Sequence, residues 1–524
     1  MFKKSVAVAA ALAMSAILPG ATTIASSSSP KAEVSAAVHH DTSRPLREMA
    51  PTSPTAHRLT ERPLRLIGPV GPDQPDGALQ AAAVGPAVGT IAGVGFAGVG
   101  NGDYGFAPDA APPDTNGAAG ATQYVQWANE SFAVFSKAGT LLQGPTRGNT
   151  IWQGFGGGCE TNNDGDPIVK YDRANDRWIL SQFSVSTTPY LQCVAVSTTG
   201  DATGTYNRYS FSYGNQFPDY GKIGIWPDGY YITYNIFNNG QTFAGSKLCA
   251  LDSAAMRTGA AATQQCFQLS TSFGGVLPSD QDGATPPPAG SPNYLLNFGT
   301  NSLNLWKFHS DFATPANATL SGPQNIPVAA FTPACGGGAC IPQPNTRQKL
   351  DTLADRLMYR LAYRNFGASQ SLVVNQSVRV SGNKHAQVDG IRWYEVSVSS
   401  ATPVIHQQGT YSPNSTNRWM GSIAMDKVGD IAVGYSESSS TVFPSIAYTG
   451  RVPTDPLGTM QAENVIKAGG GSQLSNLSRW GDYSAMTVDP VDDCTFWYTT
   501  EYLKASGTFN WSTWIASFKF PGCQ

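Results

Sequence analysis

The pattern of apolar and polar positions predicts short β-strands over most of this chain. From about residue 110 onwards, apolar runs rich in Tyr, Trp, Phe, Val and Ile alternate with short turns that contain Asp, Asn or Gly. Runs of this composition favour strands, and turns such as "RAND", "WPDG" and "DKVGD" supply residues that tolerate a positive φ between two strands. We therefore predict an all-β chain built from consecutive hairpins.

The hairpin pattern recurs as a repeated unit. The passages "RWMGSIAMDKVGDIAVGYSES" and "RWGDYSAMTVDPVDDCTFWYTTEY" have the same layout, and earlier copies begin at "TQYVQWANE", "DPIVKYDRAND", "DYGKIGIWPDG", "SPNYLLNFGTN" and "DRLMYRLAYRN". This gives seven units of roughly 60 residues each, which is typical of a repeat architecture.

Repeated antiparallel units of this size are typical of a β-propeller, in which four-stranded blades pack face to face around a channel. Both faces of a blade are covered, and "SIAM" and "DIAVGY" accordingly show little polar alternation. We predict one disulfide-stapled propeller over residues 106–524, with seven blades. Six or eight blades are alternatives, because residues 266–350 are irregular. The C-terminal strand "NWSTWIASFKF" is expected to complete the last blade with a strand from near residue 125.

The N-terminal quarter differs in texture. Lys3 and Lys4 precede an apolar run shorter than a membrane span, so residues 1–25 are predicted to be a secretory signal peptide, and no later stretch is long enough to cross a bilayer. We expect an extracellular or periplasmic protein. Residues 26–105 are rich in Ser, Ala, Pro and Gly without periodicity and are predicted to form a disordered linker or propeptide.

Eight cysteines fit an oxidising compartment, where disulfides persist. Zinc binding is disfavoured, because CxxC-type spacing with neighbouring histidines is missing. The order of the cysteines suggests that neighbours pair, although eight cysteines allow 105 connectivities. The expected pairs are Cys159–Cys193, Cys249–Cys266, Cys335–Cys340 and Cys494–Cys523.

Charge excludes one class of partner. The chain has 33 basic and 36 acidic residues, only 13% of its residues are charged, and no basic stripe is present. Nucleic-acid binding depends on the neutralisation of phosphates and is therefore not expected. We expect a monomer whose partner is an extracellular glycan or a surface protein.

Acidic residues at the entrance of several units are the main catalytic candidates. The common signatures HExxH and GxSxG and the phosphate-binding loops are missing, and His309, His385 and His406 stand alone, so a protease or esterase is a weaker hypothesis. In a propeller, Asp114, Asp166, Asp219 and Asp482 would converge at one mouth of the channel. Glycosidases commonly use two carboxyl groups, one protonated and one ionised. The alternative is that each Asp only closes a turn.

Repeated Arg-Trp pairs suggest how an acidic sugar could be held. Arg418 and Arg479 lie at the start of matching strands and could bind a carboxylate or sulfate group. Sugar rings could stack on Trp419, Trp480 and Trp497. The alternative role is a cation–π brace between blades. Tyr498 and Glu501 lie on one strand at odd spacing, so only one of them can face the site; Tyr498 is a binding candidate and Glu501 a catalytic one.

Three loops combine oxygen-bearing side chains with a glycine, as "DTNG", "NNDG" and "DQDG". Calcium prefers such oxygens, although the bidentate Glu of the full loop is missing from all three. Calcium at Asp114, Asn116, Asp164 and Asp282 is therefore one interpretation, and ordinary turns are the other.

The passages "PPDTNGAAG", "DGDPIVKYDRANDRWILSQF", "RWMGSIAMD" and "RWGDYSAMTVDPVDDCTFWYTTEY" resemble a group of large, uncharacterised secreted bacterial β-propeller proteins over about residues 105–524. The layout is more distantly similar to the sialidase-type propeller superfamily. Its Asp-box has no clean copy here, and its arginine triad and tyrosine nucleophile cannot be matched.

The resemblance implies the fold and permits glycan chemistry. We therefore expect a secreted propeller that binds an extracellular polysaccharide, with glycoside hydrolase or polysaccharide lyase activity as the enzymatic version. The alternative is a non-catalytic scaffold that binds a surface protein.

Overall fold

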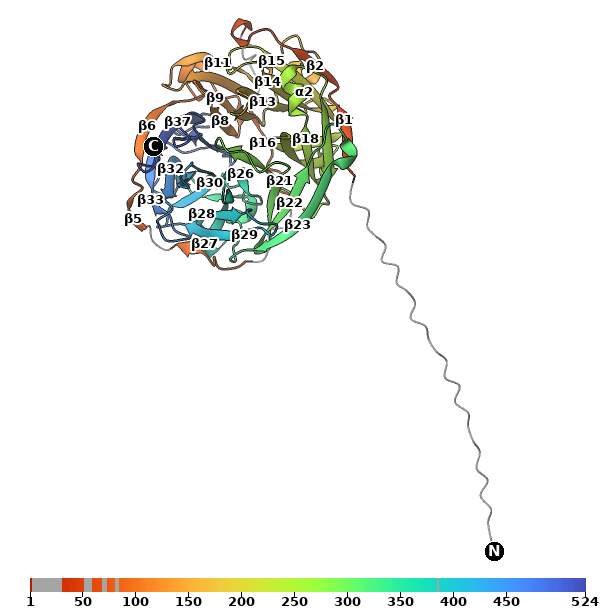
Figure 1. Cartoon of the computed structure of the whole chain (residues 1–524). Coiled ribbons are helices and arrows are strands. Elements are labelled where there is room, and N and C mark those ends of the chain that lie inside the picture. The colour runs from red at the N-terminus through yellow and green to blue at the C-terminus, as the bar shows by residue number, and fades with distance from the viewer. Residues whose placement is uncertain (2–30, 51–58, 68–72, 81–83, 384–385) are drawn as a thin grey trace.

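The computed structural model describes residue 1 and residues 31–50, 59–67, 73–80, 84–383 and 386–524. These ranges form a body of several β-sheets (Figure 1), and its two α-helices, α1 (Gly157–Thr161) and α2 (Ser253–Thr258), are short. The all-β prediction is confirmed. Apart from Met1, the predicted signal peptide lies outside the described residues. Within the described ranges, no helix combines the length and hydropathy that a membrane span needs.

Most of the body consists of antiparallel units in which each strand pairs with the next one along the chain. The first unit contains β8 (Thr115–Ala119), β9 (Gln123–Ala128), β10 (Ser131–Ser136) and β11 (Leu141–Arg147). The second contains β12 (Ile168–Asp172), β13 (Arg177–Ser184), β14 (Tyr190–Ser197) and β15 (Tyr206–Gly214). The third contains β16 (Gln216–Trp226), β17 (Gly229–Asn238), β18 (Thr242–Leu251) and β19 (Thr263–Gln268).

The next two units share one nine-stranded sheet, because β20 and β26 pair in parallel. One contains β20 (Leu277–Asp282), β21 (Asn293–Gly299), β22 (Ser302–His309) and β23 (Thr319–Pro327). The other contains β26 (Met358–Asn365), β27 (Gln370–Asn383), β28 (Ala386–Ser397) and β29 (Val404–Tyr411).

The last two units contain the two passages that share one layout in the sequence. One contains β30 (Asn417–Met425), β31 (Ile431–Ser438), β32 (Ser445–Arg451) and β34 (Asn464–Lys467). The other contains β35 (Ala485–Val488), β36 (Phe496–Tyr502) and β37 (Ser512–Lys519), and its fourth strand is β6 (Ile91–Ala97). The C-terminal strand is thus paired with β6, whereas the sequence led us to expect a strand near residue 125, which instead belongs to β9.

The first strands of the units contact one another in a circuit. Strand β8 contacts β12, and the contacts continue through β16, β20, β26, β30 and β35, which in turn contacts β8. Figure 1 shows β8, β16, β26 and β30 near the centre of the body, while β11, β23 and β5 (Val84–Ala87) lie toward its edge. This arrangement brings the entrances of strands that are distant in the sequence close together.

Local sequence explains the hairpins and the buried core. In the turn between β12 and β13, Asp172 accepts hydrogen bonds from Asn175, and Asp176 has a φ of 54°, a conformation that Asp tolerates better than most residues. Every residue of β30, β31 and β32 is buried, which agrees with the absence of polar alternation in these strands. The core is therefore formed between sheets that are covered on both faces.

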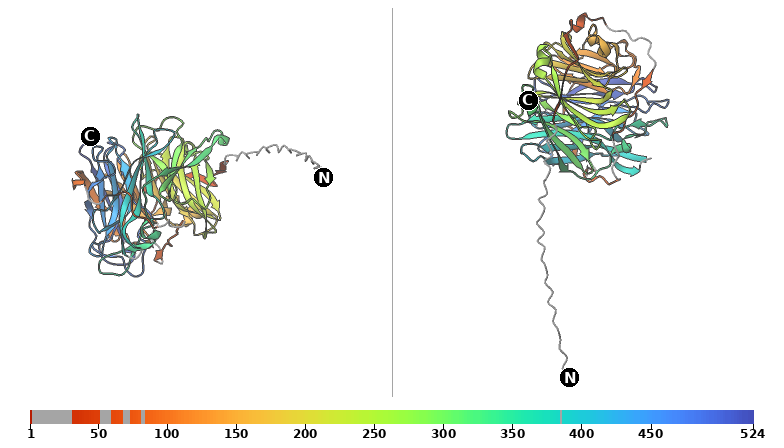
Figure 2. Two further views of the ribbon diagram at one scale, coloured as in Figure 1. Left: turned by 90° about the horizontal axis from the view of Figure 1, so that it is seen from below. Right: turned by 90° about the vertical axis from the view of Figure 1, so that its right-hand side faces the viewer.

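The prediction of a disordered linker for residues 26–105 is wrong for the described parts of that segment. Besides β6, it contributes β1 (Glu33–Ala36) to β19, β2 (His39–Thr42) to β15, and β4 (Leu79–Gln80) to β29. Strand β5 pairs with β33 (Gln461–Ala462), and β3 (Thr60–Glu61) pairs with β7 (Ala110–Ala111). Figures 1 and 2 show this red-to-orange segment running along the outside of the body. Its order comes from backbone pairing with edge strands, so it needs no apolar periodicity of its own.

All four predicted disulfides are confirmed: Cys159–Cys193, Cys249–Cys266, Cys335–Cys340 and Cys494–Cys523. Cys249 and Cys266 are direct cross-strand partners on β18 and β19. Cys335 lies in the short 3₁₀ segment Ala334–Gly337, and Cys340 lies in β24 (Ala339–Ile341), which pairs with β25 (Leu350–Asp351). Three disulfides, Cys159–Cys193, Cys249–Cys266 and Cys494–Cys523, therefore each link segments within or next to one antiparallel unit. The fourth, Cys335–Cys340, closes a small loop.

Candidate active site

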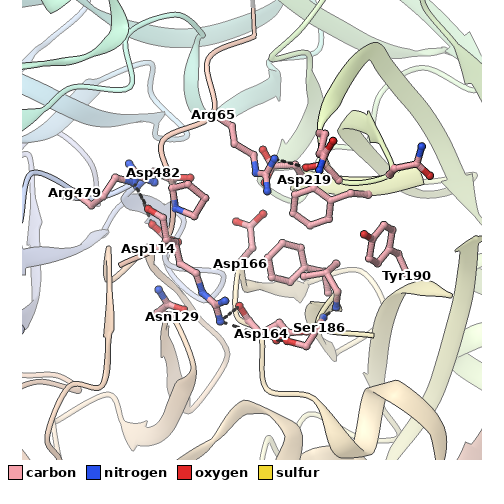
Figure 3. Close-up of a pocket in the computed structure, with 18 residues that line it drawn as sticks. Arg65, Asp114, Asn129, Asp164, Asp166, Ser186, Tyr190, Asp219, Arg479 and Asp482 are labelled. Carbon is pink, nitrogen blue, oxygen red and sulfur yellow. Dashed lines mark hydrogen bonds and ion pairs between the residues drawn. The ribbon is translucent and has the colours of Figure 1, made fainter. Parts of the chain in front are cut away.

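A pocket of about 460 Å³ lies where the chain enters several of the first strands (Figure 3). Five aspartates and three arginines line it, together with an apolar wall that includes Phe183, Phe217 and Tyr190. Ligand sites commonly have this combination of an apolar surface and a few converging polar groups. The charged residues that line the pocket are Arg62, Arg65, Asp114, Asp164, Asp166, Asp219, Arg479 and Asp482.

The pocket brings together the four carboxylates at the unit entrances. Asp114 precedes β8, Asp166 precedes β12, Asp219 lies near the start of β16, and Asp482 precedes β35. Figure 3 shows Asp166 in the middle, with Asp114 and Asp482 on one side and Asp219 on the other. Asp114 and Asp166 have left-handed backbones, with φ of 43° and 51°. Asp tolerates this conformation better than most residues, and non-glycine residues in it are frequent at functional sites.

Arg479 organises one side of the pocket. Its guanidinium forms ion pairs with Asp482 and with Asp351, the latter at 2.5 Å, and its Nε donates to the carbonyl of Arg62 at 3.0 Å. The backbone N–H of Asp482 donates to the Asp114 carboxylate at 2.9 Å. Burial, with the nearby charges of Asp482 and Asp166, raises the pKa of Asp114 well above its ordinary value. Asp482 is therefore held as an ion-pair partner, while Asp114 favours its protonated form.

Asp166 is held by a buried lysine. Lys222 Nζ lies 3.3 Å from Asp166 Oδ1 and is sandwiched between the rings of Tyr220 and Tyr483, at 3.7 and 3.9 Å from their centroids. The Tyr483 hydroxyl donates to the same carboxylate oxygen at 2.9 Å. Burial lowers the pKa of Lys222, and Asp166 is the strongest of the carboxylates that oppose this shift. The aromatic rings and the carboxylate together stabilise the ammonium in a buried position.

Asp219 has a different environment from Asp166. Among the described residues, no hydrogen bond to its carboxylate is found, and burial, followed by the charges of Asp166 and Asp482, raises its pKa to about 7. Arg356 and Arg65 act in the opposite direction. The pocket thus contains one carboxyl group whose pKa is raised into the neutral range and a second carboxyl group that is paired with a lysine. This is the electrostatic arrangement of an acid and its ionised partner.

The N-terminal segment completes the pocket wall. Arg62 pairs with Glu130 at 2.7 Å, and its backbone N–H donates to the carbonyl of Ala111. Three residues later, Arg65 Nη1 donates to the carbonyl of Gly240 at 2.6 Å, and its guanidinium lies 4.8 Å from the centroid of Phe217. Residues 59–67 therefore extend from the first unit to the third, across the pocket.

Arg418 and its neighbours lie outside the pocket. Arg418 is buried in an ion pair with Glu463, and its guanidinium lies 5.6 Å from the Tyr411 ring. The rings of Trp419 and Trp480 are buried against each other at 5.9 Å, and Trp497 donates its indole N–H to Asp489. The expectation that Arg418, Arg479 and the three tryptophans share one binding site is therefore wrong. Of the two arginines, only Arg479 lines the pocket. The tryptophans pack between sheets.

Tyr498 and Glu501 are also buried beneath the surface. The Tyr498 hydroxyl donates to Ser484, and its ring faces Gly434 on β31. Glu501 lies on the other side of the strand, where it accepts hydrogen bonds from Thr115 at 2.9 Å and Thr500 at 3.1 Å. Burial raises the pKa of Glu501 to about 8. Neither side chain lines the pocket, so their expected roles as binding and catalytic residues are not supported by their positions.

The carboxylates of the proposed calcium loops are occupied by protein donors. Asp164 accepts from the backbone N–H of Val185 and Ser186 at 2.6 and 2.8 Å, and Asp282 pairs with Arg360 at 2.5 Å. Asn116 accepts from the backbone N–H of Val169. Within the described ranges, the one group of metal-ligating side chains close enough to share an ion is Cys335, Cys340 and Asp389, whose sulfurs form a disulfide.

The three histidines form no triad in the described structure. His309 lies 3.4 Å from Asp228, and His406 borders a second pocket, of about 280 Å³, that also includes Ser371. No hydrogen bond joins either histidine to a serine among the described residues, and His385 lies outside them.

Sequence patterns left several pocket residues unidentified. Lys222 lies three residues after Asp219 in the strand "DYGKIGIW", where strict alternation would place the two on opposite faces. A β-bulge between them changes this register, and the sequence does not signal it. Arg62 and Arg65 belong to the segment that was predicted to be disordered. Their participation depends on the long-range path of the N-terminal segment, for which the local sequence carries no signal.

Known protein families and curated proteins provide no match to this chain. Solved structures that this chain is similar to include an exo-β-1,3-galactanase from Clostridium thermocellum, at 10% identity and a TM-score of 0.31, covering 82% of this chain and 97% of that one. A PL25 ulvan lyase has 11% identity and a TM-score of 0.34, covering 79% and 97%. An endo-arabinase from Bacteroides thetaiotaomicron has 12% identity and a TM-score of 0.27, covering 56% and 95%. At these scores, none of them assigns a role to a residue of this chain.

Proposed function

We propose that this chain is a secreted, seven-bladed β-propeller whose pocket binds and hydrolyses an extracellular polysaccharide. The blade count is supported by the seven antiparallel units and by the circuit of contacts among their first strands. Export is supported by the four disulfides, because such bonds persist in oxidising compartments.

The observation that carries the hydrolase proposal is the contrast between Asp219 and Asp166. Cleavage of a glycosidic bond requires one carboxylic acid that protonates the leaving oxygen and one carboxylate that acts as nucleophile or activates water. Asp219, with a pKa raised to about 7, is the acid. Asp166, held by Lys222 and Tyr483, is the ionised partner. Asp482, fixed by Arg479, shapes the opposite wall of the pocket.

The apolar wall favours a sugar as the ligand. Phe183, Phe217 and Tyr190 line the pocket, and the Phe217 ring centroid lies 5.6 Å from that of Phe183 and 5.8 Å from that of Tyr190. A pyranose ring has an apolar face of C–H groups that can pack on such rings, while its hydroxyls reach the carboxylates opposite. The pocket volume of about 460 Å³ leaves room for one or two sugar units.

The test is an activity and binding assay on purified protein with a panel of neutral and acidic polysaccharides, scored by new reducing ends and by direct affinity measurements. We expect cleavage whose rate falls as the pH rises above about 7, because Asp219 then loses its proton. Asp219→Asn and Asp166→Asn are each expected to lower kcat by roughly 10²-fold or more, and in Asp219→Asn the basic limb disappears.

Asp201→Asn is the matched control, because Asp201 is a partly exposed aspartate that pairs with Arg47 and does not line the pocket. Its activity is expected to equal that of the unmodified protein. Full cleavage by both Asp219→Asn and Asp166→Asn would overturn the assignment of the acid and its partner.

Binding without hydrolysis is the second candidate. It is favoured by the internal ion pairs of Asp166 and Asp482, since each ionised carboxylate already has a cation partner. In that case the panel shows binding that Asp219→Asn weakens, and no reducing ends appear at any pH. A lack of affinity for every glycan would instead direct the search to a surface protein as the partner.

A further inference from the structure

The disulfide Cys335–Cys340 differs from the other three in its exposure. Both of its half-cystines are partly exposed, whereas each of the other six is at most 3% exposed. A thiolate from solution must reach a sulfur atom in order to exchange with a disulfide. Among the four disulfides, this one is therefore the accessible target.

The accessible disulfide has a buried carboxyl group beside it. Asp389 Oδ2 lies 3.7 Å from Cys335 Sγ and 3.6 Å from Cys340 Sγ, and the Asp389 side chain is fully buried. Gln387 Nε2 donates to Asp389 Oδ1 at 2.5 Å and also approaches Cys335 Sγ at 3.7 Å. Both sulfurs are thus within reach of the same carboxyl oxygen.

Among the residues that the structure describes, no cation is paired with Asp389. Arg379, on the neighbouring strand β27, is the one charged group that lowers its pKa, and the guanidinium of Arg379 forms its ion pair with Asp73 at 3.2 Å. On the β30 side, the Asp389 backbone N–H donates to the uncharged Asn417. Burial raises the pKa of Asp389 to about 7. A carboxylic acid therefore lies against the disulfide near neutral pH.

The loop between the two cysteines is short and glycine-rich. Five positions separate them in sequence, and Gly336 and Gly337 have φ of 59° and 81°. A cross-link over so short a loop restrains the unfolded chain less than one over a long loop. Opening this disulfide is accordingly expected to cost the fold less than opening any of the others.

We propose that Cys335–Cys340 is a redox-active disulfide that exchanges with low-molecular-weight thiols, with Asp389 as the proton donor and acceptor for the sulfur atoms. This activity is separate from the polysaccharide pocket and does not depend on it.

In the reduction, a small-molecule thiolate attacks Cys335 Sγ and forms a mixed disulfide, while the S–S bond breaks and its electron pair leaves on Cys340 Sγ. The Asp389 carboxylic acid gives its proton to that sulfur. A second thiolate attacks the mixed disulfide, releases the small-molecule disulfide, and leaves Cys335 as a thiolate that takes a proton from solvent. The transfer from Asp389 is downhill, because an ordinary cysteine thiol has a pKa near 8.5. Both sulfurs lie within 3.7 Å of Asp389 Oδ2, so the same scheme holds with Cys340 as the site of first attack and Cys335 as the leaving sulfur.

The experiment treats the folded, full-length protein with glutathione at several pH values, alkylates free thiols at timed intervals, and identifies them by mass spectrometry. We expect Cys335 and Cys340 to be alkylated first, with the other three disulfides as internal references. The rate constant per glutathione thiolate is expected to fall by about tenfold or more as the pH rises through 7, because general acid assistance is lost with the Asp389 proton.

Asp389→Asn is expected to have the slow rate at every pH, since the amide has the size of the acid but donates no transferable proton. If that variant does not fold, Gln387→Ala tests the same site: loss of its hydrogen bond to the carboxylate is expected to move the midpoint of the pH profile upward. Simultaneous reduction of all four disulfides, or a rate per thiolate that does not change with pH in the unmodified protein, would overturn the proposal. Intact polysaccharide cleavage by Asp389→Asn would show that the two activities are independent.

Discussion

Glu501 illustrates how a single buried carboxyl group sets a pH dependence. Its side chain lies in the core between β36 and β8 and is hydrogen-bonded by two threonine hydroxyls, and no described residue forms an ion pair with it. Its pKa is raised from 4.5 to about 8 by burial. Between these two values, the folded state retains a proton that the unfolded state has lost. The free energy of unfolding therefore decreases as the pH rises through this window.

Glu501→Gln is expected to remove this decrease. The amide has the size of the protonated acid and can accept the same hydroxyl hydrogen bonds through its oxygen. One retained proton corresponds to a slope of about 1.4 kcal/mol per pH unit in the free energy of unfolding. The free energy of unfolding of the unmodified protein is therefore expected to fall between pH 5 and pH 8 by more than that of the variant. Chemical denaturation at several pH values measures the difference. Parallel stability curves for the two proteins would contradict the assignment.

At the residue scale, the sequence identifies part of the site. An aspartate at the entrance of successive units is a local pattern, and the pocket contains Asp114, Asp166, Asp219 and Asp482. The Arg-Trp repeat is equally visible in sequence, yet Arg418 and Arg479 have different surroundings. Glu463 is available to bind the first, whereas the second meets Asp351 and Asp482. Which partner a repeated residue finds depends on loops that are not repeated.

At the scale of elements, close packing between sheets depends on individual glycines. Gly434 on β31 faces Tyr498 on β36, and a Cβ added at Gly434 would lie 2.5 Å from the tyrosine ring. The ring is itself fixed by the hydrogen bond from its hydroxyl to Ser484. The last two units can therefore pack this closely only because Gly434 has no side chain.

Gly434→Ala is expected to lower the free energy of unfolding by about 1–3 kcal/mol, the usual cost of overpacking a filled core. Gly89→Ala is the matched control, because nothing lies within 4 Å of the added methyl group; it is expected to change stability little. Thermal and denaturant unfolding of both variants measure the effect. Equal stability of the two variants would show that the sheets can separate without cost.

The sequence predicts elements well where apolar residues are consecutive. The passages with matching layout form the hairpins β30–β31 and β35–β36. It does not predict β1, β2 and β4, which are two to four residues long and largely exposed. These strands form because they pair with strands that are distant in the sequence. Local periodicity carries no signal of that pairing and therefore predicts a linker.

At the scale of the whole molecule, the N-terminal segment contributes strands to several sheets, and its strand β6 completes the sheet that contains the C-terminal strand β37. Without β6, the backbone N–H and C=O groups along one side of β37 would be unpaired. Unpaired edges of this kind promote association between chains. The covering of edges is therefore expected to matter for solubility as well as for stability.

A chain that begins at residue 98 is expected to unfold at a lower temperature and to form oligomers, because it lacks the six strands β1 to β6. A chain that begins at residue 31 keeps all six strands and is the control. Thermal unfolding and size-exclusion chromatography with light scattering compare the two. If the shorter chain remained a single species with an unchanged melting temperature, edge pairing by this segment would be dispensable.

The partnership of β6 with β37 also governs when the protein can finish folding during its synthesis. Ala97 leaves the ribosome roughly 400 residues before Ser512, which at about 5–20 residues per second is a delay of tens of seconds. Throughout that interval β6 has no partner, while the units encoded in between can already assemble one after another. The final sheet can form only after β37 has been synthesised, so a nascent chain stalled before Ser512 would hold the other units with an open seam at β36.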